Sequence, residues 1–216
     1  MEKLILHEAY KRLDKIKHPV IVVIGAYTGN DVIEFAKKYP TGTIHAIEAC
    51  PVNFKILKDR VVSLKNVVCD NIAISNENGI VDFYYANQKK NNGTSQGNSL
   101  YKKFVSQKKW VKEAKVIKIK SLTLDAFYKL HKINYVDFLK INAEGAEYKI
   151  FENPEFVKNT NMIYVILHAK QGIFNELLFV KKRKEIYGKL CNMGLGMIKG
   201  TVSSSKNKHH PQLWAR

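Results

Sequence analysis

The sequence predicts an α/β fold built on a mostly parallel sheet. Residues 20–24 are all β-branched and stand between Pro19 and Gly25, a pattern typical of a strand buried on both faces. Residues 43–47 and 67–69 are further apolar runs, and segments with helical spacing of apolar residues separate the three runs. Strands that alternate with helices of about 10–15 residues are typical of βαβ units, which place neighbouring strands parallel.

The first half of the chain supplies the elements of this pattern in order. A helix over residues 30–39 follows the first strand, and a helix over residues 51–64 follows the second. Pro51 stands in the first turn of that second helix, where proline is tolerated. The third strand then ends at Cys69.

The pattern changes after the third strand. Asn78-Gly79 is a strong turn dipeptide, and it predicts an antiparallel hairpin between residues 71–75 and 80–85. This hairpin would be an antiparallel insertion into an otherwise parallel fold.

Two unusual segments follow the hairpin. Residues 87–99 contain no Val, Ile, Leu or Phe and are rich in Asn, Gly and Ser, which is typical of a mobile loop. In residues 115–120, apolar residues alternate with lysines, which predicts an exposed edge strand because lysine commonly guards sheet edges.

The second half returns to alternating helices and strands. The predicted elements are a helix over 122–131, a strand over 136–141, a short helix over 145–151, a strand over 162–167, a helix over about 174–191 and a strand near 195–202.

The net positive charge of the chain comes from two segments. The 216 residues carry 36 Lys and Arg against 19 Asp and Glu, a formal net charge of +17. Residues 87–120 hold ten lysines against Glu113, residues 181–216 hold nine Lys or Arg against Glu185, and the remainder is neutral. We therefore expect a single domain over residues 1–216, with a basic insertion at about 87–120 and a basic C-terminal segment at about 181–216.

The basic insertion has two interpretations. Tyr101, Phe104 and Trp110 stand among its lysines, and aromatic rings between cations can stack bases while the cations bind phosphates. This favours a phosphate-bearing or nucleic-acid partner. The alternative is that the rings only attach the insertion to the body of the protein.

The composition also bears on location. No stretch approaches the roughly 20 apolar residues of a membrane span, and the charged N-terminal segment has no apolar core of a signal peptide. Cys50, Cys69 and Cys191 form no CxxC motif and are expected to be buried thiols of a reducing compartment, which predicts a cytoplasmic protein.

Three strand ends carry residues suited to a ligand. Gly25 and Gly29 lie in the turn after the first strand, where glycine allows close approach to backbone amides, although a plain helix-start turn has the same pattern. Glu48 ends the second strand, where a carboxylate can accept both hydroxyls of a ribose or can simply be solvated. Asp70-Asn71 ends the third strand and could contact an adenine edge or form a turn.

Four spaced motifs carry a resemblance to a known family. They are V-V-I-G-A-Y-T-G-N-D, I-E-A-C-P-V-N-F-K-I-L, N-I-A-I-S-N-E-N-G-I-V-D-F and V-D-F-L-K-I-N-A-E-G-A-E. In this order, over residues 20–170, they resemble the FkbM-type S-adenosylmethionine-dependent methyltransferases. The resemblance implies a Rossmann-like class I methyltransferase fold: a mostly parallel seven-stranded sheet with helices on both faces. It implies S-adenosylmethionine as cofactor and methyl transfer to a hydroxyl of a sugar, glycan or other small molecule.

The resemblance also implies which residues form the site. Gly25, Ala26 and Gly29 match the part of the motif beside the methionine, Glu48 matches the ribose ligand, and Asn142 matches the strand-end motif together with Glu144 and Glu147. The residues expected to bind the cofactor are Gly25, Ala26, Tyr27, Gly29, Asp31, Glu48, Ala49, Asp70, Asn71, Ile72 and Asn142.

The chain departs from the family pattern at carboxylate positions. Val23 and Asn142 each stand where the pattern has Asp, and Leu167 stands where it has Glu. Carboxylates favour a cofactor that carries a sulfonium and an ammonium, so these losses leave open a non-catalytic relative that kept the fold. Asp31 and Glu144 are the residues that can compensate.

Transfer to a hydroxyl benefits from a base. His168 follows the strand over residues 162–167 at the carboxyl edge of the sheet, and it is the expected general base or substrate anchor, with a structural hydrogen-bonded histidine as the alternative. Glu144 is the second catalytic candidate; its alternative is a hydrogen bond to the following turn. No cluster of metal ligands is evident, so no metal is expected. A nucleic-acid or nucleotide-linked acceptor remains the alternative substrate class.

Overall fold

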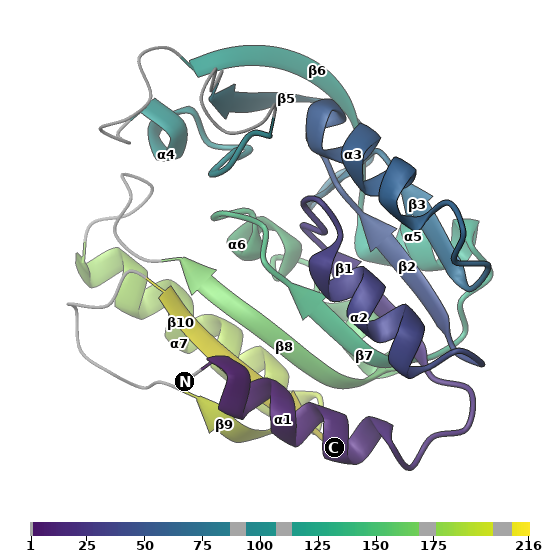
Figure 1. Cartoon of the computed structure of the whole chain (residues 1–216). Coiled ribbons are helices and arrows are strands. Elements are labelled where there is room, and N and C mark those ends of the chain that lie inside the picture. The colour runs from purple at the N-terminus through teal and green to yellow at the C-terminus, as the bar shows by residue number, and fades with distance from the viewer. Residues whose placement is uncertain (1, 87–93, 107–113, 169–175, 201–208) are drawn as a thin grey trace.

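The centre of the molecule is a seven-stranded sheet (Figure 1). The computed structural model describes residues 2–86, 94–106, 114–168, 176–200 and 209–216. The strands of this sheet are β1 (Val20–Ile24), β2 (Thr43–Ile47), β3 (Val67–Asp70), β7 (Val136–Ile141), β8 (Thr160–His168), β9 (Gly196–Gly200) and β10 (His209–Ala215). Their order is β3-β2-β1-β7-β8-β10-β9. The predicted α/β fold with a mostly parallel seven-stranded sheet is confirmed.

The strand directions create a crevice beside β1. This strand pairs in parallel with β2 on one side and with β7 on the other, so the chain order reverses between β1 and β7. In open α/β sheets, ligands bind outside the carboxyl ends of the strands at such a switch point. Only β10 runs antiparallel to its neighbours β8 and β9.

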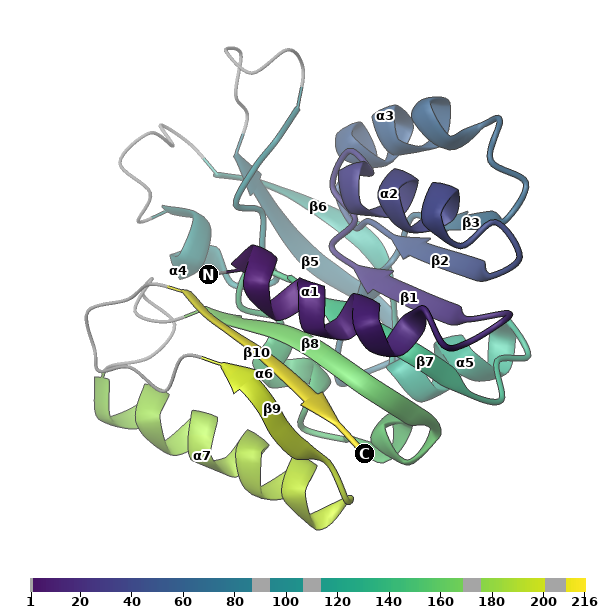
Figure 2. The ribbon, with the colours of Figure 1, turned by 60° about the horizontal axis from the view of Figure 1, so that its bottom comes forward.

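Helices cover both faces of the sheet (Figures 1 and 2). One face packs against α1 (Glu2–Leu13), α2 (Asn30–Lys38) and α3 (Pro51–Val61). The other packs against α5 (Leu124–Leu130), α6 (Glu147–Ile150), α7 (Glu176–Asn192) and the 3-10 helix η1 (Glu155–Asn159). The β-branched run of β1 serves both cores, because Ile21 and Val23 lie in the first and Val22 and Ile24 in the second.

Two elements at the ends of the chain were not predicted. In α1, Ile5, Ala9 and Leu13 are almost fully buried at a spacing of four residues, although charged residues separate them in the sequence. Strand β10 contains Pro211 and only a short apolar run. Its position is set by pairing with the nine-residue strand β8, which lies far away in the chain, and with β9, rather than by local pattern.

The antiparallel insertion has a different pairing from the one predicted. It comprises β4 (Ala73–Ile74), β5 (Gly79–Ala86) and β6 (Ala114–Leu122), in the order β4-β6-β5, and the short helix α4 (Lys102–Ser106) lies beside it (Figure 1). The predicted hairpin is wrong, because β5 pairs with β6 over eight residue pairs and β4 pairs with β6 in parallel. The chain does turn at Gly79, but β5 forms its backbone hydrogen bonds with β6, which is longer than β4.

The predicted edge strand over residues 115–120 is therefore also wrong, since β6 is the central strand of its sheet. Lys118 and Lys120 lie on the solvent-facing side, with Lys118 paired to Asp82 at 2.7 Å, while Ile119 on the opposite side is buried. The alternation reports a sheet with one exposed face rather than an exposed edge.

Parts of the two basic segments lie outside the described residues: 87–93, 107–113 and 201–208. Within the expected mobile loop, however, residues 94–99 have fixed hydrogen-bond partners. Among the described helices, none has the length and apolar character needed to cross a membrane. The prediction of buried thiols holds for Cys50 and is wrong for Cys191, which is exposed.

Candidate functional site

A cavity of about 350 Å³ opens at the carboxyl ends of β1, β2 and β7, where the strand order reverses. Small-molecule pockets commonly measure about 300–1,000 Å³, so this cavity has room for one ligand. Five segments enclose it, with Asn53 of α3: the turn after β1, the end of β2, residues 72–74, the loop after β7, and a wall made by residues 95–98 with Leu100 and Phe83.

The turn after β1 touches the loop after β7 through its backbone. Gly25 has φ +77°, and a β-carbon added there would lie 2.0 Å from the backbone oxygen of Asn142. Glycine is therefore required at this position by the contact between the two loops, in addition to any ligand. The amides of Gly25 and Ala26 both donate to the carbonyl oxygen of Ile47, which ties the turn to β2.

Glu48 is the best-anchored carboxylate of the cavity. Its side chain accepts hydrogen bonds from the backbone amides of Tyr27 and Cys50, each at 2.8 Å, and the residue is 6% exposed. Burial raises the pKa of Glu48 to about 7, against the opposing effect of the two amides. Tyr27 reaches this carboxylate with φ 53°, a left-handed conformation that non-glycine residues seldom adopt.

The structure brings together most of the residues expected to bind a cofactor. Those that line the cavity are Gly25, Ala26, Tyr27, Asp31, Glu48, Ala49, Ile72 and Asn142. Three others lie outside the lining. The backbone of Gly29 packs against Leu57, the carboxylate of Asp70 lies 3.2 Å from Nε2 of His131, and the amide of Asn71 donates to the backbone oxygens of Glu48 and Ala49.

Asp31 is part of an ion pair. Its carboxylate contacts the ammonium of Lys140, a residue of β7 that is only 4% exposed. The cross-strand neighbour of Lys140 on β1 is Val23, which offers no charge, so the buried ammonium takes its counter-ion from α2. Asp31 remains 44% exposed on the cavity side of this pair.

Asn142 presents an unused acceptor to the cavity. Its side-chain oxygen is buried, and no donor among the described residues reaches it. Buried polar atoms are nearly always hydrogen-bonded, so this atom is suited to a donor group of a ligand.

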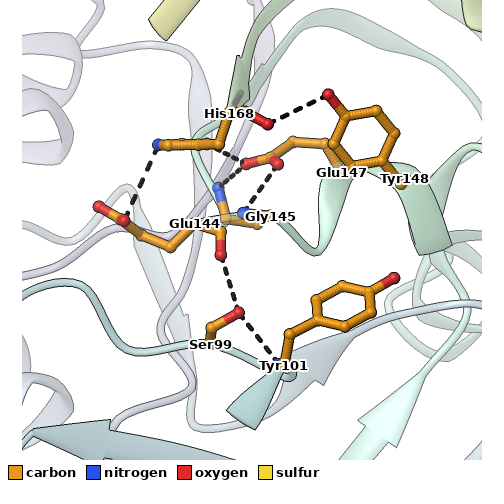
Figure 3. Close-up of polar contacts among 8 residues, drawn as sticks. Ser99, Tyr101, Glu144, Gly145, Glu147, Tyr148 and His168 are labelled. Carbon is orange, nitrogen blue, oxygen red and sulfur yellow. Dashed lines mark hydrogen bonds and ion pairs between the residues drawn. The ribbon is translucent and has the colours of Figure 1, made fainter. Parts of the chain in front are cut away.

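A charged cluster borders the same cavity (Figure 3). The carboxylate of Glu147 is fully buried and accepts from the amides of Ala143 and Gly145 at 2.7 and 2.9 Å. It also lies 2.9 Å from Nδ1 of His168. Because a carboxylate can only accept, Nδ1 carries the ring proton, which leaves Nε2 of a neutral ring as an acceptor.

Glu144 stands between this cluster and the cavity. Its carboxylate lies 3.9 Å from Nε2 of His168 and lines the cavity, whereas His168 is 3% exposed and does not. Glu144 has φ 49°, and its carbonyl oxygen accepts from the hydroxyl of Ser99 at 2.8 Å (Figure 3). The geometry thus separates the two predicted catalytic residues, with Glu144 at the surface of the cavity and His168 behind it.

The wall of the cavity was missed from the sequence. Ser95, Gln96 and Asn98 lie in a segment whose composition predicts a mobile loop, and nothing local indicates that it folds over the strand ends. Asn53, which holds this wall, belongs to the second motif and could have been found there.

The charges around the cavity have one sign. Asp31, Glu48 and Glu144 are among its lining residues, and among the described lining residues none is Lys, Arg or His. Within the described part of the chain, no three His, Cys, Asp or Glu side chains are placed to share a metal ion.

Comparison with known proteins gives one family and a set of similar structures. A profile of the family described as Methyltransferase FkbM domain matches residues 24–194. No curated protein sequence matches the chain.

Three solved structures illustrate the similarity of fold. Fibrillarin, a pre-rRNA processing protein of Methanococcus jannaschii, has a TM-score of 0.52 and 13% identity, with 92% of this chain and 66% of that chain covered. Aeropyrum pernix fibrillarin with natively bound S-adenosyl-L-methionine has a TM-score of 0.53, 13% identity and coverage of 98% and 74%. A putative rRNA methylase of Clostridium thermocellum has a TM-score of 0.55, 8% identity and coverage of 98% and 94%. The chain spans just under two thirds of the first of these proteins, and at such identities the likeness establishes the fold.

Proposed function

The chain belongs to the FkbM methyltransferase family, whose cofactor is S-adenosylmethionine, and we propose that it transfers the methyl group to a hydroxyl of an uncharged sugar, glycan or other small molecule. The observation that carries this proposal is the make-up of the cavity. Its described lining holds three carboxylates and no cationic side chain, which suits a cationic cofactor and disfavours a phosphate group at the point of transfer.

The residues present fit the cofactor. S-adenosylmethionine, when bound, supplies a methyl group on a sulfonium that is already activated for transfer. Glu48 would hold the ribose hydroxyls, since a carboxylate that accepts two amides still has lone pairs left. The side-chain oxygen of Asn142, which no donor among the described residues reaches, would accept from the ammonium, and Ala49 and Ile72 would contact the adenine. Asp31 and Glu144 line the cavity and would offset the losses at Val23, Asn142 and Leu167, which favours an enzyme over a non-catalytic relative.

Glu144 is the proposed catalytic residue, because it reaches the cavity. It would take the proton that the acceptor hydroxyl loses. His168 would act as a positioning residue: Glu147 fixes its ring, and its Nε2 lies 3.9 Å from the Glu144 carboxylate, where the imidazole influences that carboxylate through its charge and position.

Labelled methyl transfer tests the proposal. Glu144→Gln should lower the rate of transfer from S-adenosylmethionine to unphosphorylated sugars by about 10²–10⁴-fold, because the amide cannot take a proton. Because Glu144 is also one of the carboxylates that favour the cationic cofactor, calorimetry should show cofactor affinity lowered by less than about tenfold, a smaller change than the loss in rate. His168→Ala should lower the rate by roughly a hundredfold while cofactor binding stays intact.

The matched control is Glu152→Gln, which changes an exposed carboxylate outside the cavity and should leave transfer unchanged. Full activity of Glu144→Gln would remove Glu144 from the mechanism. Absence of cofactor binding by the wild type at millimolar concentration would contradict the enzyme proposal as a whole.

Cofactor affinity should depend on the ionisation of Glu48. With its pKa at about 7, Glu48 is mainly protonated at about pH 6, and a protonated carboxyl is a poor acceptor for two ribose hydroxyls. The dissociation constant for S-adenosylmethionine, measured by calorimetry, should rise about tenfold from about pH 8 to about pH 6. The Glu48→Gln variant should bind more weakly and vary less than about twofold over the same range.

The contribution of Glu48 to stability should fall as the pH rises, whereas the cofactor affinity should increase. Because the pKa of Glu48 is raised in the folded state, the folded chain binds more protons than the unfolded chain between about pH 4.5 and about pH 7. The contribution of Glu48 to the free energy of unfolding therefore falls as the pH rises through this interval. Equal slopes for the wild type and Glu48→Gln would contradict the assignment.

Nucleic acid is the second candidate substrate. Lys115, Lys118 and Lys120 are exposed on β6, whose sheet forms part of the cavity wall, and the similar structures include a putative rRNA methylase. Phosphates would then lie on β6, outside the acidic cavity. Absence of RNA binding at low salt would exclude this candidate, whereas affinity that falls steeply with salt would support it.

A further inference from the structure

Residues 94–100 form a wall that is held at both ends. On the α3 side, the side-chain amide of Asn53 donates to the carbonyl oxygen of Ser95 at 2.7 Å, and the Ser95 amide donates to the side-chain oxygen of Asn53 at 2.9 Å. Asn53 is 2% exposed and Ser95 is 4% exposed, so both bonds are shielded from water. A single side chain thus satisfies both backbone groups of one residue, as a neighbouring strand would.

The other end of the wall is held by β5 and by the loop after β7. Ser99 and Tyr84 exchange two backbone hydrogen bonds of 2.9 Å. The Ser99 hydroxyl donates to the carbonyl oxygen of Glu144, the proposed catalytic residue (Figure 3). Between these attachments, residues 95–98 face the cavity, and Gln96 donates to the hydroxyl of Tyr27.

Asn53 also lies beside the group proposed to hold the ribose. Both Asn53 and Glu48 line the cavity, and the Asn53 amide opposes the rise in the pKa of Glu48 caused by burial. An asparagine amide has two N–H donors and one acceptor oxygen, so it can serve Glu48 and Ser95 together. Glu48, Asn53 and Ser95 therefore form a continuous line from the floor of the cavity to its wall.

We propose that Asn53 is a positioning residue that couples occupation of the cofactor pocket to the placement of the 94–100 wall, against which the acceptor binds. Ribose hydroxyls on Glu48 would hold that carboxylate in place, Glu48 would hold the Asn53 amide, and Asn53 would hold Ser95. The wall then opens less often when the cofactor is bound, and the acceptor meets a completed site. This inference rests on the proposed function, because it takes Glu48 as the ribose ligand.

Hydrogen exchange of the backbone amides of residues 94–100 tests the coupling. The full chain is compared with and without saturating S-adenosylhomocysteine, the non-reactive product of the cofactor. In the wild type, ligand should slow exchange by about fivefold or more. In Asn53→Ala the slowing should fall below about twofold, because Ser95 loses both hydrogen bonds to the side chain that lies beside Glu48.

The chain offers a matched control and a second variant. Asn66 likewise donates to two backbone oxygens, those of Ala36 and Tyr39, but lies outside the cavity lining, so Asn66→Ala should keep the ligand-dependent slowing. Asn53→Thr has nearly the same side-chain volume and adds no charge beside Glu48, so this variant should fold even if Asn53→Ala does not. Its single hydroxyl has one proton to donate and cannot serve Ser95 and Glu48 together, so the slowing should again be lost.

The outcomes separate the inference from the proposed function. If calorimetry shows that S-adenosylhomocysteine does not bind the wild type, the proposed function fails. If the ligand binds without slowing exchange in the wild type, or slows it equally in Asn53→Thr, the role of Asn53 is overturned while the cofactor site stands.

Discussion

Gly25→Ala is expected to lower the free energy of unfolding by about 3–5 kcal/mol and to abolish binding of S-adenosylmethionine. The new β-carbon would lie 2.0 Å from the backbone oxygen of Asn142 and 2.9 Å from its carbonyl carbon, and neither atom can rotate away. The residue must also keep φ +77°, which L side chains rarely adopt. The two loops that move apart are opposite sides of the cavity, so the damage reaches the proposed cofactor site. Chemical denaturation and calorimetric titration measure the two effects.

Gly188→Ala is the control for this substitution. Gly188 lies exposed in α7, and a β-carbon there would meet no atom within 4 Å. Alanine should therefore raise the free energy of unfolding by about 0.5–1 kcal/mol, because it restricts the unfolded chain and suits a helix. Wild-type stability and affinity in Gly25→Ala would mean that the two loops are not in contact in solution.

Glu147→Gln is expected to lower the free energy of unfolding by about 3 kcal/mol or more. Glu147 is fully buried, and all three of its described partners, the amides of Ala143 and Gly145 and Nδ1 of His168, are donors. The amide of glutamine would turn an N–H group toward at least one donor and leave it unpaired. The substitution keeps the volume of the side chain, so the loss reports hydrogen bonding rather than a cavity.

Chemical denaturation measures this loss, and the imidazole ¹⁵N signals of His168 report its cause. In the wild type the proton should lie on Nδ1, and in Glu147→Gln the tautomer population should shift. Glu155→Gln changes an exposed carboxylate that forms an ion pair with Lys158 and should cost less than about 1 kcal/mol. An unchanged His168 signal in Glu147→Gln would contradict the proposed role of Glu147 in fixing the ring.

Local patterns predicted the parallel core because each of its strands is recognisable alone. The β-branched run of β1 predicts a strand buried on both faces, and in the structure its side chains pack into two separate hydrophobic cores. The pairing of the insertion could not be read in the same way. The turn at Asn78-Gly79 is real, but β5 takes its hydrogen bonds from β6, which begins 28 residues after β5 ends. The strength of a turn does not determine which strand is available to pair.

Some residues of the candidate site could likewise be predicted from local patterns, and others could not. Strand-end residues such as Glu48 and Asn142 were predictable, because the carboxyl ends of parallel strands meet at one edge of the sheet. Asp70 and Asn71 met the same criterion, yet they lie outside the lining because His131 and the backbone of residues 48–49 lie beside them. Competition among neighbours for a polar side chain is a property of the folded chain.

The sequence by itself determined the α/β core, the strand ends that carry polar groups, and the family, because these depend on burial patterns and motifs that lie within short segments. Only the tertiary structure decided that His168 lies behind Glu144, that Lys140 takes its counter-ion from Asp31, and that residues 94–100 close the cavity through Asn53. Each of these relations joins residues more than 20 positions apart. Their distances are set by the packing of separate elements, and no local pattern encodes such distances.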